Sequence, residues 1–310
     1  MSASVYCPLT HITMPVFGRP DETLETIAAL RRNTRQPIVF TVVDNGNEPG
    51  FSRELERLAD AGQIDHLFIL DRNYGVSPAC NVGWQLVDAP FFMKLDNDTK
   101  ILSLDWLSNI YGMWGAARYS TLMGPVWHCR KERGSTQTPY GTLWKLPVSF
   151  GGTAFFVGKK ISDQLGFFSE DYGLYGEEDA DYCLRCHHAG IRKYSFEAEN
   201  VLELTDQHDS ASSYEAIKQQ AHEGNVGTGS GRGIFALNVF LYEHSLRSVR
   251  VPLRYAIRAV QGRHVELVER SDYPARWDKL QQCLELFDQS GRAPTPECIE
   301  AMRRILGSDI

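Results

Sequence analysis

Two aspartates separated by one residue are the feature around which this sequence is organised. Asp96 and Asp98 flank an asparagine and directly follow the mostly apolar run Phe91–Leu95. Hard carboxylate oxygens at this spacing can hold Mg²⁺ or Mn²⁺ beside a phosphate, because these ions fill their remaining coordination positions with phosphate and water. A polar turn after a strand would give the same pattern, since aspartate and asparagine are frequent in turns. The segment alone therefore leaves a metal site and a turn open.

The apolar run before these aspartates is the last of four segments that we predict to be strands. The others are His11–Phe17, Ile38–Val43 and Ile64–Leu70, and polar residues follow each of them. Helices are expected between the strands, over Thr23–Asn33 with Asp21 as its N-cap, over Ser52–Ala61 and over Ser77–Val87. Alternating strands and helices imply right-handed crossovers and parallel strands, whose carboxyl ends meet at one edge of the sheet. We therefore predict a nucleotide site at that edge.

Length and composition indicate an ordinary soluble globular protein. The 310 residues are 43% hydrophobic and 23% charged, which favours one large α/β domain with a smaller appended segment. The net charge of -7 and the lack of a long basic cluster argue against nucleic acid as a main partner, because that binding depends on neutralising phosphates. An acidic protein that handles a phosphorylated substrate would need a bound cation.

Cysteine usage and hydropathy bear on location. Seven cysteines, an odd number scattered from Cys7 to Cys298, do not form a disulfide framework, so we expect a reducing compartment. The chain shows no signal segment and no apolar stretch of the roughly 18 residues needed to span a bilayer. These features predict a cytoplasmic protein, which could still lie at the inner membrane surface.

Short motifs follow one another along the chain in a specific order. They are Met14–Phe17, Val42–Gly46, Arg72–Val76, Ala79–Gly83 and Leu95–Asp98, and then Ser149–Ala154, Leu165–Phe168 and Glu178–Arg185. This series resembles the family 2 glycosyltransferases over roughly Ile12 to Ser212. The resemblance implies an inverting enzyme of the GT-A fold. That fold is α/β, with a Rossmann-like, mostly parallel sheet flanked by helices, here followed by a helical C-terminal segment.

The resemblance also implies where a nucleotide-sugar donor and a metal ion bind. In that family the first strand's end and the Asp-Asn-Gly turn hold the nucleotide, usually UDP, and the Asp-x-Asp segment holds the metal on its diphosphate. The implied donor-binding residues are Pro15, Phe17, Arg19, Asp44, Asn45, Asn73, Asn81, Asp96, Asn97 and Gly152. The implied ligands of Mn²⁺ or Mg²⁺ are Asp98, His208 and Asp96. Asn47 stands where the family usually has serine, and we expect the Asn45-Gly46 turn to survive this change.

A second acidic group precedes the segment Ala180–Ala189, which we predict to be a helix. Glu177, Glu178 and Asp179 could simply complement the dipole of that helix. The resemblance gives them a further role, because the family carries its general base at the Glu-Asp pair. It implies that Asp179 takes the proton of the acceptor hydroxyl, with Glu178 as the alternative base.

The chain divides into three parts by composition. Residues 1–225 form the predicted GT-A domain, with a donor half over about 1–100 and an acceptor and base half over about 101–225. Residues 226–233 form a glycine-rich loop, which could be a lid or a linker. Residues 234–310 are expected to form helices over Ile234–Leu246, Pro252–Gln261, Trp277–Gln289 and Glu297–Leu306. Their apolar and arginine-rich faces could contact a membrane surface, a second copy of the chain or the catalytic domain.

We therefore predict a metal-dependent inverting glycosyltransferase. It would move a sugar from a nucleoside-diphosphate donor, with UDP favoured, to a hydroxyl of a polysaccharide or glycolipid. A sugar-phosphate nucleotidyltransferase is the enzyme alternative, but Gly18-Arg19-Pro20 is short for the glycine-rich loop which that class carries after its first strand. A carbohydrate-binding relative without catalysis is the other alternative, and it could lack the base or the metal ligands.

Overall fold

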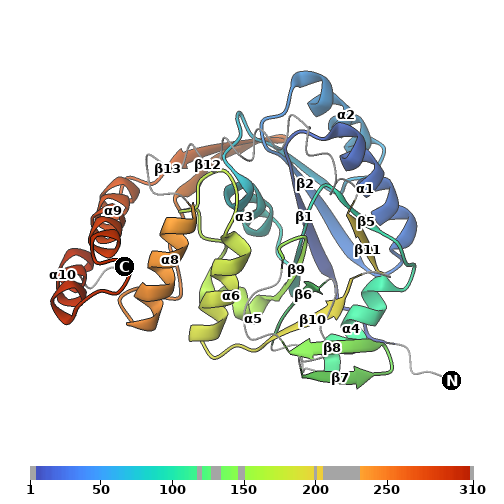
Figure 1. Ribbon diagram of the computed structural model, residues 1–310. Helices are drawn as coiled ribbons and strands as arrows, with labels where there is room; N and C mark the ends of the chain where they lie inside the picture. The colour runs from blue at the N-terminus through green and yellow to red at the C-terminus, as the bar shows by residue number, and fades with distance from the viewer. Residues whose placement is uncertain are drawn as a thin grey trace.

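The computed structural model describes residues 5–116, 121–126, 134–145, 151–198, 201–204 and 231–307. Its centre is a large mixed sheet flanked by helices (Figure 1). The strand order in that sheet is β12-β13-β3-β2-β1-β4-β9-β6-β10-β8-β7. Strands β5 and β11 form a separate small sheet. The predicted α/β class is therefore confirmed.

The first half of the sheet is parallel, as the alternating pattern predicts. Its strands are β1 (Thr10–Val16), β2 (Ile38–Asp44), β3 (His66–Ile69) and β4 (Phe91–Leu95). They are connected by α1 (Pro20–Asn33), α2 (Pro49–Asp60) and α3 (Val76–Leu86). Proline starts both α1 and α2, because its fixed φ suits the first helical turn. Asp21 is not the N-cap of α1, which is Arg19 in a left-handed conformation. The carboxyl ends of all four strands meet at one edge.

The second half of the sheet mixes strand directions. Strand β9 (Ala154–Gly158) lies antiparallel to β4, and β6 (Leu122–Val126) follows it. Strand β10 (Lys193–Glu197) is parallel to β6 and antiparallel to β8 (Gly141–Lys145), which pairs with β7 (Ser135–Thr138). The helices here are α4 (Trp106–Ala116), α5 (Lys159–Leu165) and α6 (Glu178–His188), and the small sheet joins β5 (Thr99–Ile101) to β11 (Leu202–Leu204). The pairing of β9 with β4 brings α6 toward the edge where the parallel strands end.

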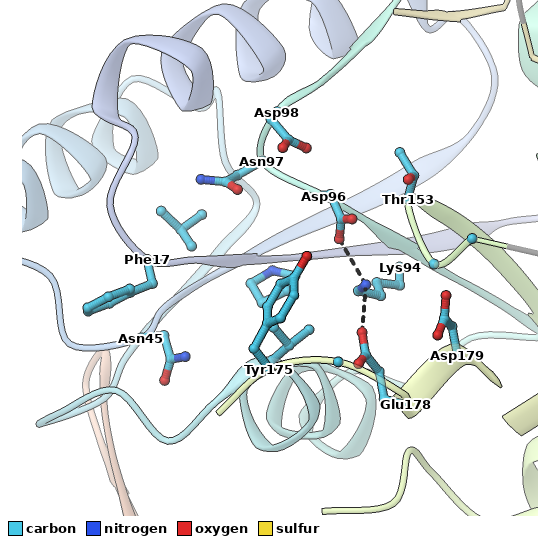
Figure 2. Close-up of a pocket in the computed structure, with 16 residues that line it drawn as sticks. Phe17, Asn45, Lys94, Asp96, Asn97, Asp98, Thr153, Tyr175, Glu178 and Asp179 are labelled. Atoms are coloured by element: carbon cyan, nitrogen blue, oxygen red, sulfur yellow. Dashed lines mark hydrogen bonds and ion pairs between the residues drawn. The ribbon is translucent and has the colours of Figure 1, made fainter. Parts of the chain in front are cut away.

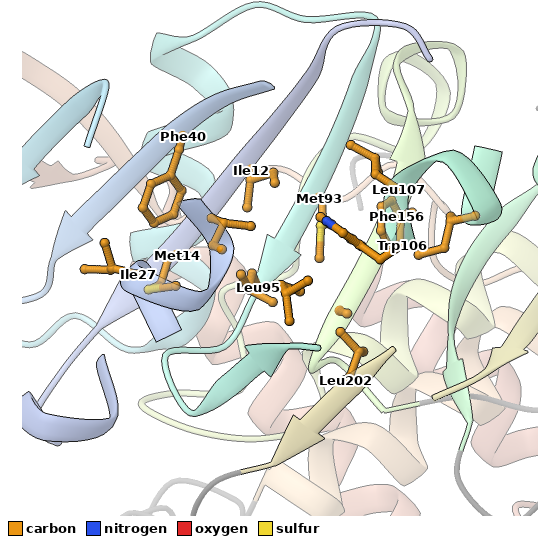
Figure 3. Close-up of a cluster of buried hydrophobic side chains, with 14 of the residues drawn as sticks. Ile12, Met14, Ile27, Phe40, Met93, Leu95, Trp106, Leu107, Phe156 and Leu202 are labelled. Carbon is orange, nitrogen blue, oxygen red and sulfur yellow. The ribbon is translucent and has the colours of Figure 1, made fainter. Parts of the chain in front are cut away.

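The core fills the space between the central strands and the helices that cover them. Ile12, Met93 and Phe156 come from three neighbouring strands, and Trp106 packs beside them from α4 (Figure 3). All four side chains are fully buried. Burying each large apolar side chain contributes about 1.5–3 kcal/mol. The strand ends that project from this core are therefore held firmly.

The C-terminal part differs from the sequence prediction in one element. A helix was expected over Pro252–Gln261, but strand β12 (Tyr255–Gln261) runs there and forms a hairpin with β13 (His264–Glu269). Gly262 turns this hairpin at a φ of 61°, and β13 continues the main sheet beside β3. The pairing of β12 with β13, which in turn joins the sheet beside β3, decided the conformation, and the spacing of the arginines in the sequence does not reveal it.

The other predicted helices of this part are confirmed. They are α8 (Gly231–Glu243), α9 (Tyr273–Gln289) and α10 (Pro296–Leu306). Helix α8 begins inside the glycine-rich segment, whose residues 226–230 lie outside the described part of the chain. Phe240 and Leu246 are buried against α9 and α10, so this apolar face packs within the molecule. Within the described ranges no helix combines the length and the apolar character that crossing a membrane requires.

Substitutions at two glycines with positive φ, Gly62 and Gly75, distinguish the effect of backbone strain from the effect of steric crowding. Gly62 has a φ of 71° with open space around a hypothetical Cβ, whereas a Cβ on Gly75 would lie 2.5 Å from the carbonyl oxygen of Gly173. Gly62→Ala should lower the free energy of unfolding by about 1 kcal/mol, because only the backbone is strained. Gly75→Ala should lower the free energy of unfolding by about 1–3 kcal/mol more than Gly62→Ala does, since the added methyl group presses on Gly173.

Urea denaturation of both variants and the parent protein measures this difference. Equal losses for Gly62→Ala and Gly75→Ala would show that the contact between Gly75 and Gly173 does not constrain the fold.

Candidate active site

A cavity of about 320 Å³ lies where β1 and β4 end, and the loop before α6 closes its other side (Figure 2). Side chains from both halves of the sheet converge on it. The lining residues are Pro15, Val16, Phe17, Asn45, Val76, Lys94, Asp96, Asn97, Asp98, Gly151, Gly152, Thr153, Tyr175, Gly176, Glu178 and Asp179. The structure thus brings the Asp-x-Asp segment and the Glu-Asp pair into a single cavity.

Lys94 joins these two acidic groups. Its ammonium lies 2.9 Å from Oδ1 of Asp96 and 3.3 Å from Oε1 of Glu178, while the side chain is only 3% exposed. Burial opposes the charge, but Asp96, Glu178 and Asp179 together raise the pKa of Lys94 well above its usual value. Sequence reasoning gave Lys94 no role. The available signal was a charged residue inside an apolar strand, two positions before Asp96 and therefore on the same face.

Asp179 has the electrostatic properties of a group that can exchange a proton near neutral pH. Burial, followed by the negative charge of Glu178, raises the pKa of Asp179 to about 7, although Lys94 and a hydrogen bond from the Ala180 amide oppose this. That amide donates to Oδ1 of Asp179 over 2.7 Å in the first turn of α6. Gly152 leaves the space for this carboxylate, because a Cβ there would lie 3.1 Å from Cβ of Asp179.

The Asp-x-Asp segment is held by the start of α1. Asn97 donates through Nδ2 to Oγ1 of Thr23 over 2.8 Å, and Asp98 forms an ion pair with Arg19. Arg19 adopts a left-handed conformation with a φ of 55° and a ψ of 58°. A non-glycine residue in this region is strained, and such strain concentrates at functional sites. The start of α1 therefore anchors Asn97 and Asp98.

Asp96 and Asp98 supply two carboxylates that suit a hard divalent cation, but a third ligand is not found among the described residues. Their carboxylates are 33% and 26% exposed, respectively, and both line the cavity. Oxygen donors of this kind suit Mg²⁺ and Mn²⁺. The described ranges hold no group of three or more histidine, cysteine or acidic residues arranged for a metal ion. His208, the third predicted ligand, lies outside the described residues.

The turn after β2 forms the other wall of the site. Asn45 lines the cavity and donates through Nδ2 to Oδ1 of Asn73 and to the Gly75 carbonyl, over 2.9 and 3.1 Å. Gly46 has a φ of 79°, so the expected turn is present. Asn47 closes it by donating its amide and its Nδ2 to Oδ1 of Asp44, over 2.9 and 2.7 Å.

Some predicted donor residues lie behind this wall. Asp44 is fully buried, and its Oδ2 has no hydrogen-bond partner within the part of the chain that the structure describes. Asn81 is also fully buried, where it bonds to the backbone of Phe168 and to Glu170. The described lining therefore includes Pro15, Phe17, Asn45, Asp96, Asn97 and Gly152, whereas Arg19, Asp44, Asn73 and Asn81 do not line the cavity. Of these four, Arg19 and Asn73 contact lining residues, Asp98 and Asn45.

A comparison with protein families places this architecture. The family model described as "Glycosyl transferase family 2" matches residues 11–169, which is about half of the chain. The chain belongs to glycosyl transferase family 2. A comparison with curated protein sequences finds no match.

Solved structures show the same fold at low sequence identity. A mannosyltransferase from Pyrobaculum calidifontis in complex with GDP-Man and Mn²⁺ superposes with a TM-score of 0.55 at 12% identity, covering 98% of this chain and 86% of that one. TarS from S. aureus has a TM-score of 0.52 at 12% identity, covering 96% of this chain and 52% of that one. GalNAc-T7 with UDP, GalNAc and Mn²⁺ has a TM-score of 0.49 at 12% identity, covering 61% and 42%. The chain thus spans about half the length of the last two of these proteins. The two superpositions with TM-scores above 0.5 confirm the GT-A fold.

Removing the ammonium of Lys94 tests the electrostatics of the cavity. Lys94→Met should lower the free energy of unfolding by about 3 kcal/mol at pH 8, because it leaves the carboxylates of Asp96 and Glu178 without their cation. The loss should be smaller at pH 6, since Asp179, whose pKa is about 7 in the parent, is then largely protonated and repels its neighbours less.

Thermal unfolding at both pH values measures this effect. Lys100→Met is the control, because Lys100 pairs with Glu25 at the surface and its loss should be small at either pH. A loss for Lys94→Met that is equal at pH 6 and pH 8 would contradict the proposed balance of charges.

Proposed function

We propose that this chain is a metal-dependent inverting glycosyltransferase that transfers a sugar from a nucleoside-diphosphate donor to a hydroxyl of a polysaccharide or glycolipid. One observation carries the proposal. Asp179, with a pKa raised to about 7, shares one cavity with Asp98, which lies toward the other end of it, and with Asp96, which lies between them beside Lys94 (Figure 2). In-line displacement at a sugar carbon needs a base on one side of that carbon and a site for the leaving diphosphate on the other. Asp179 is the proposed base, and Asp96 and Asp98 are proposed to face the diphosphate.

The residues of the chain divide the chemistry between them. Asp179 accepts the proton of the acceptor hydroxyl as this oxygen attacks the anomeric carbon from the side opposite the departing nucleotide. The bond from that carbon to the diphosphate oxygen breaks with inversion. Bound at Asp96 and Asp98, Mn²⁺ or Mg²⁺ would neutralise the charge that develops on the leaving diphosphate. Lys94 keeps Glu178 paired, which leaves Asp179 as the carboxylate available to the acceptor.

The nucleotide of the donor has two candidates. The resemblance of the motifs to the family favours UDP, whereas the mannosyltransferase with the higher TM-score was solved with GDP-Man and Mn²⁺. Pro15, Phe17 and Asn45 form the side of the cavity proposed to receive the base and ribose. A screen of UDP- and GDP-linked sugars for hydrolysis and thermal shift distinguishes the two.

The alternatives predict different features. A sugar-phosphate nucleotidyltransferase would have a longer glycine-rich loop after the first strand, but here α1 begins at Pro20, directly after Gly18 and Arg19. A carbohydrate-binding relative without catalysis would not need a carboxylate with a pKa near 7 in the cavity. Both considerations favour the transferase.

The first test of the proposed function concerns the metal. Asp98→Ala should abolish the part of UDP or GDP binding that depends on Mn²⁺, because it removes an oxygen ligand, while the fold is retained. Calorimetry with and without Mn²⁺ measures this, and Asp105→Ala at an exposed position serves as the control. Unchanged affinity of Asp98→Ala in Mn²⁺ would rule out this residue as a ligand.

The second test concerns the base. The ionised form of Asp179 is the active one, so kcat/KM should rise with pH until it levels off above about 7, following the pKa of this carboxyl group. Asp179→Asn should lower kcat by about 10²-fold or more and remove this dependence, while donor affinity is kept. Glu178→Gln should lower kcat by a smaller factor than Asp179→Asn.

Turnover and donor binding must be measured together for both variants. An active Asp179→Asn beside an inactive Glu178→Gln that still binds donor would move the base to Glu178. If both variants remain active, the Glu-Asp pair only starts a helix.

A further inference from the structure

The segment that leads into α6 lies just beyond the matched family region, which ends at residue 169, and it is contacted by residues of the C-terminal part of the chain. The segment 171–177 carries Tyr175 into the cavity and leads to Glu178, the first residue of α6. Helix α8 and the loop that follows it lie beside α6 (Figure 1). The C-terminal part therefore borders the machinery proposed for proton transfer.

Arg247 is the central group in this contact. Its guanidinium donates to Oδ2 of Asp171 over 2.5 Å and also to Oδ1 of Asn238 on α8. Asn238 in turn donates through Nδ2 to the hydroxyl of Tyr172 over 2.7 Å. Asn238 is fully buried, and Arg247 and Asp171 are 7% and 8% exposed. Two successive residues of the segment are thus bound to the C-terminal part.

The chain of contacts continues into α6 itself. Tyr172 donates its hydroxyl proton to Oδ1 of Asp181 over 2.8 Å, and Arg185 donates through Nε to Oδ2 of the same carboxylate over 2.7 Å. Arg185 also donates to the carbonyls of Leu165 and Phe167, over 2.8 and 2.9 Å. Asp181 lies one residue beyond Ala180, whose amide holds Asp179. Movement of this network would move the proposed base.

The opposite side of the segment rests on α3. The amide of Val76 donates to the carbonyl of Leu174 over 3.2 Å. Gly173, Gly176 and Glu177 all have positive φ, at 74°, 94° and 66°. A segment with this backbone is stable only when its surroundings hold it, because the conformation of Glu177 is unfavourable for a residue with a side chain. Helix α3 holds the middle of the segment, and Arg247 with Asn238 holds its beginning.

We propose that Arg247 is a positioning residue, which acts through Asp171, Asn238 and Tyr172 to set the segment 171–177 and the first turn of α6 for catalysis. The inference rests on the proposed function for its effect on turnover. Its structural part, that Arg247 orders the segment, is independent of which reaction the site performs. The network is buried and contains charges, so a missing partner cannot readily be replaced by water.

The test compares Arg247→Met with Arg250→Met. Arg250 lies in the same loop and donates to the carbonyl of Asp163 at the surface, so its replacement makes the same change in charge outside the network. With the nucleotide sugar that the parent protein hydrolyses, Arg247→Met should lower kcat by about 10²-fold, the scale for a misplaced catalytic group, and leave KM nearly unchanged. Arg250→Met should behave like the parent.

Tyr172→Phe provides a milder variant in case Arg247→Met does not fold. It removes only the hydroxyl that joins Asn238 to Asp181, and kcat should fall by up to about tenfold, the equivalent of one hydrogen bond. Arg247→Lys retains the charge but cannot make both contacts, so its kcat should lie between those of the parent and Arg247→Met.

Hydrogen exchange separates failure of this inference from failure of the proposed function. In Arg247→Met and Tyr172→Phe, amides of residues 171–181 should exchange faster than in the parent, while those of β4 should not change. If the parent hydrolyses no UDP- or GDP-linked sugar, the proposed function fails, and the exchange data alone decide whether Arg247 orders the segment. Unchanged exchange of these amides in Arg247→Met, or values of KM and kcat for Arg247→Met that match those of Arg250→Met, would overturn the inference.

Discussion

The candidate site depends on the two ion pairs that the buried ammonium of Lys94 forms with Asp96 and Glu178. Lys94 rises from β4 and pairs with Asp96 on its own strand end and with Glu178 at the start of α6. Without a cation there, a chain with a net charge of -7 would hold Asp96, Glu178 and Asp179 around one cavity, and their mutual repulsion would oppose the closure of α6 onto the sheet. Lys94 therefore links the donor half of the domain to the half that carries the proposed base. It also lowers the pKa of Asp179 against the effects of burial and of Glu178.

Around this ion pair, the site is shaped mainly by the backbone. The turn after β2 requires a positive φ at Gly46, and Asn47 closes it on Asp44. Asn45 then ties this turn to the loop before α3 through Asn73. A Cβ on Gly75 would strike Gly173, so α3 and the segment before α6 fit closely only because glycine is present. These contacts explain why residues such as Asn73 matter for the cavity without lining it.

The C-terminal part completes the domain and is more than an added helical segment. Strand β13 extends the sheet beside β3, and α8 buries Asn238 against the start of the segment 171–177. Glu170 accepts the backbone amides of Arg254 and Tyr255 over 2.7 and 2.9 Å and also bonds to Asn81. The C-terminal part is thus connected to α3 and α6, the two helices that border the cavity, through buried polar contacts.

The elements with local signals could be predicted from the amino-acid sequence. The four parallel strands, the helices between them, and the placing of Asp96, Asp98 and Asp179 at element ends could all be read from apolar runs, prolines and acidic residues. Tertiary structure alone decided what depends on distant partners. It attached the hairpin that contains Tyr255–Gln261 to the sheet beside β3, paired Lys94 with Glu178, and placed Asn81 behind the cavity against Glu170. The physical reason is that local spacing records which side of an element is apolar, whereas ion pairs and strand pairing between residues far apart in the chain depend on how the elements pack.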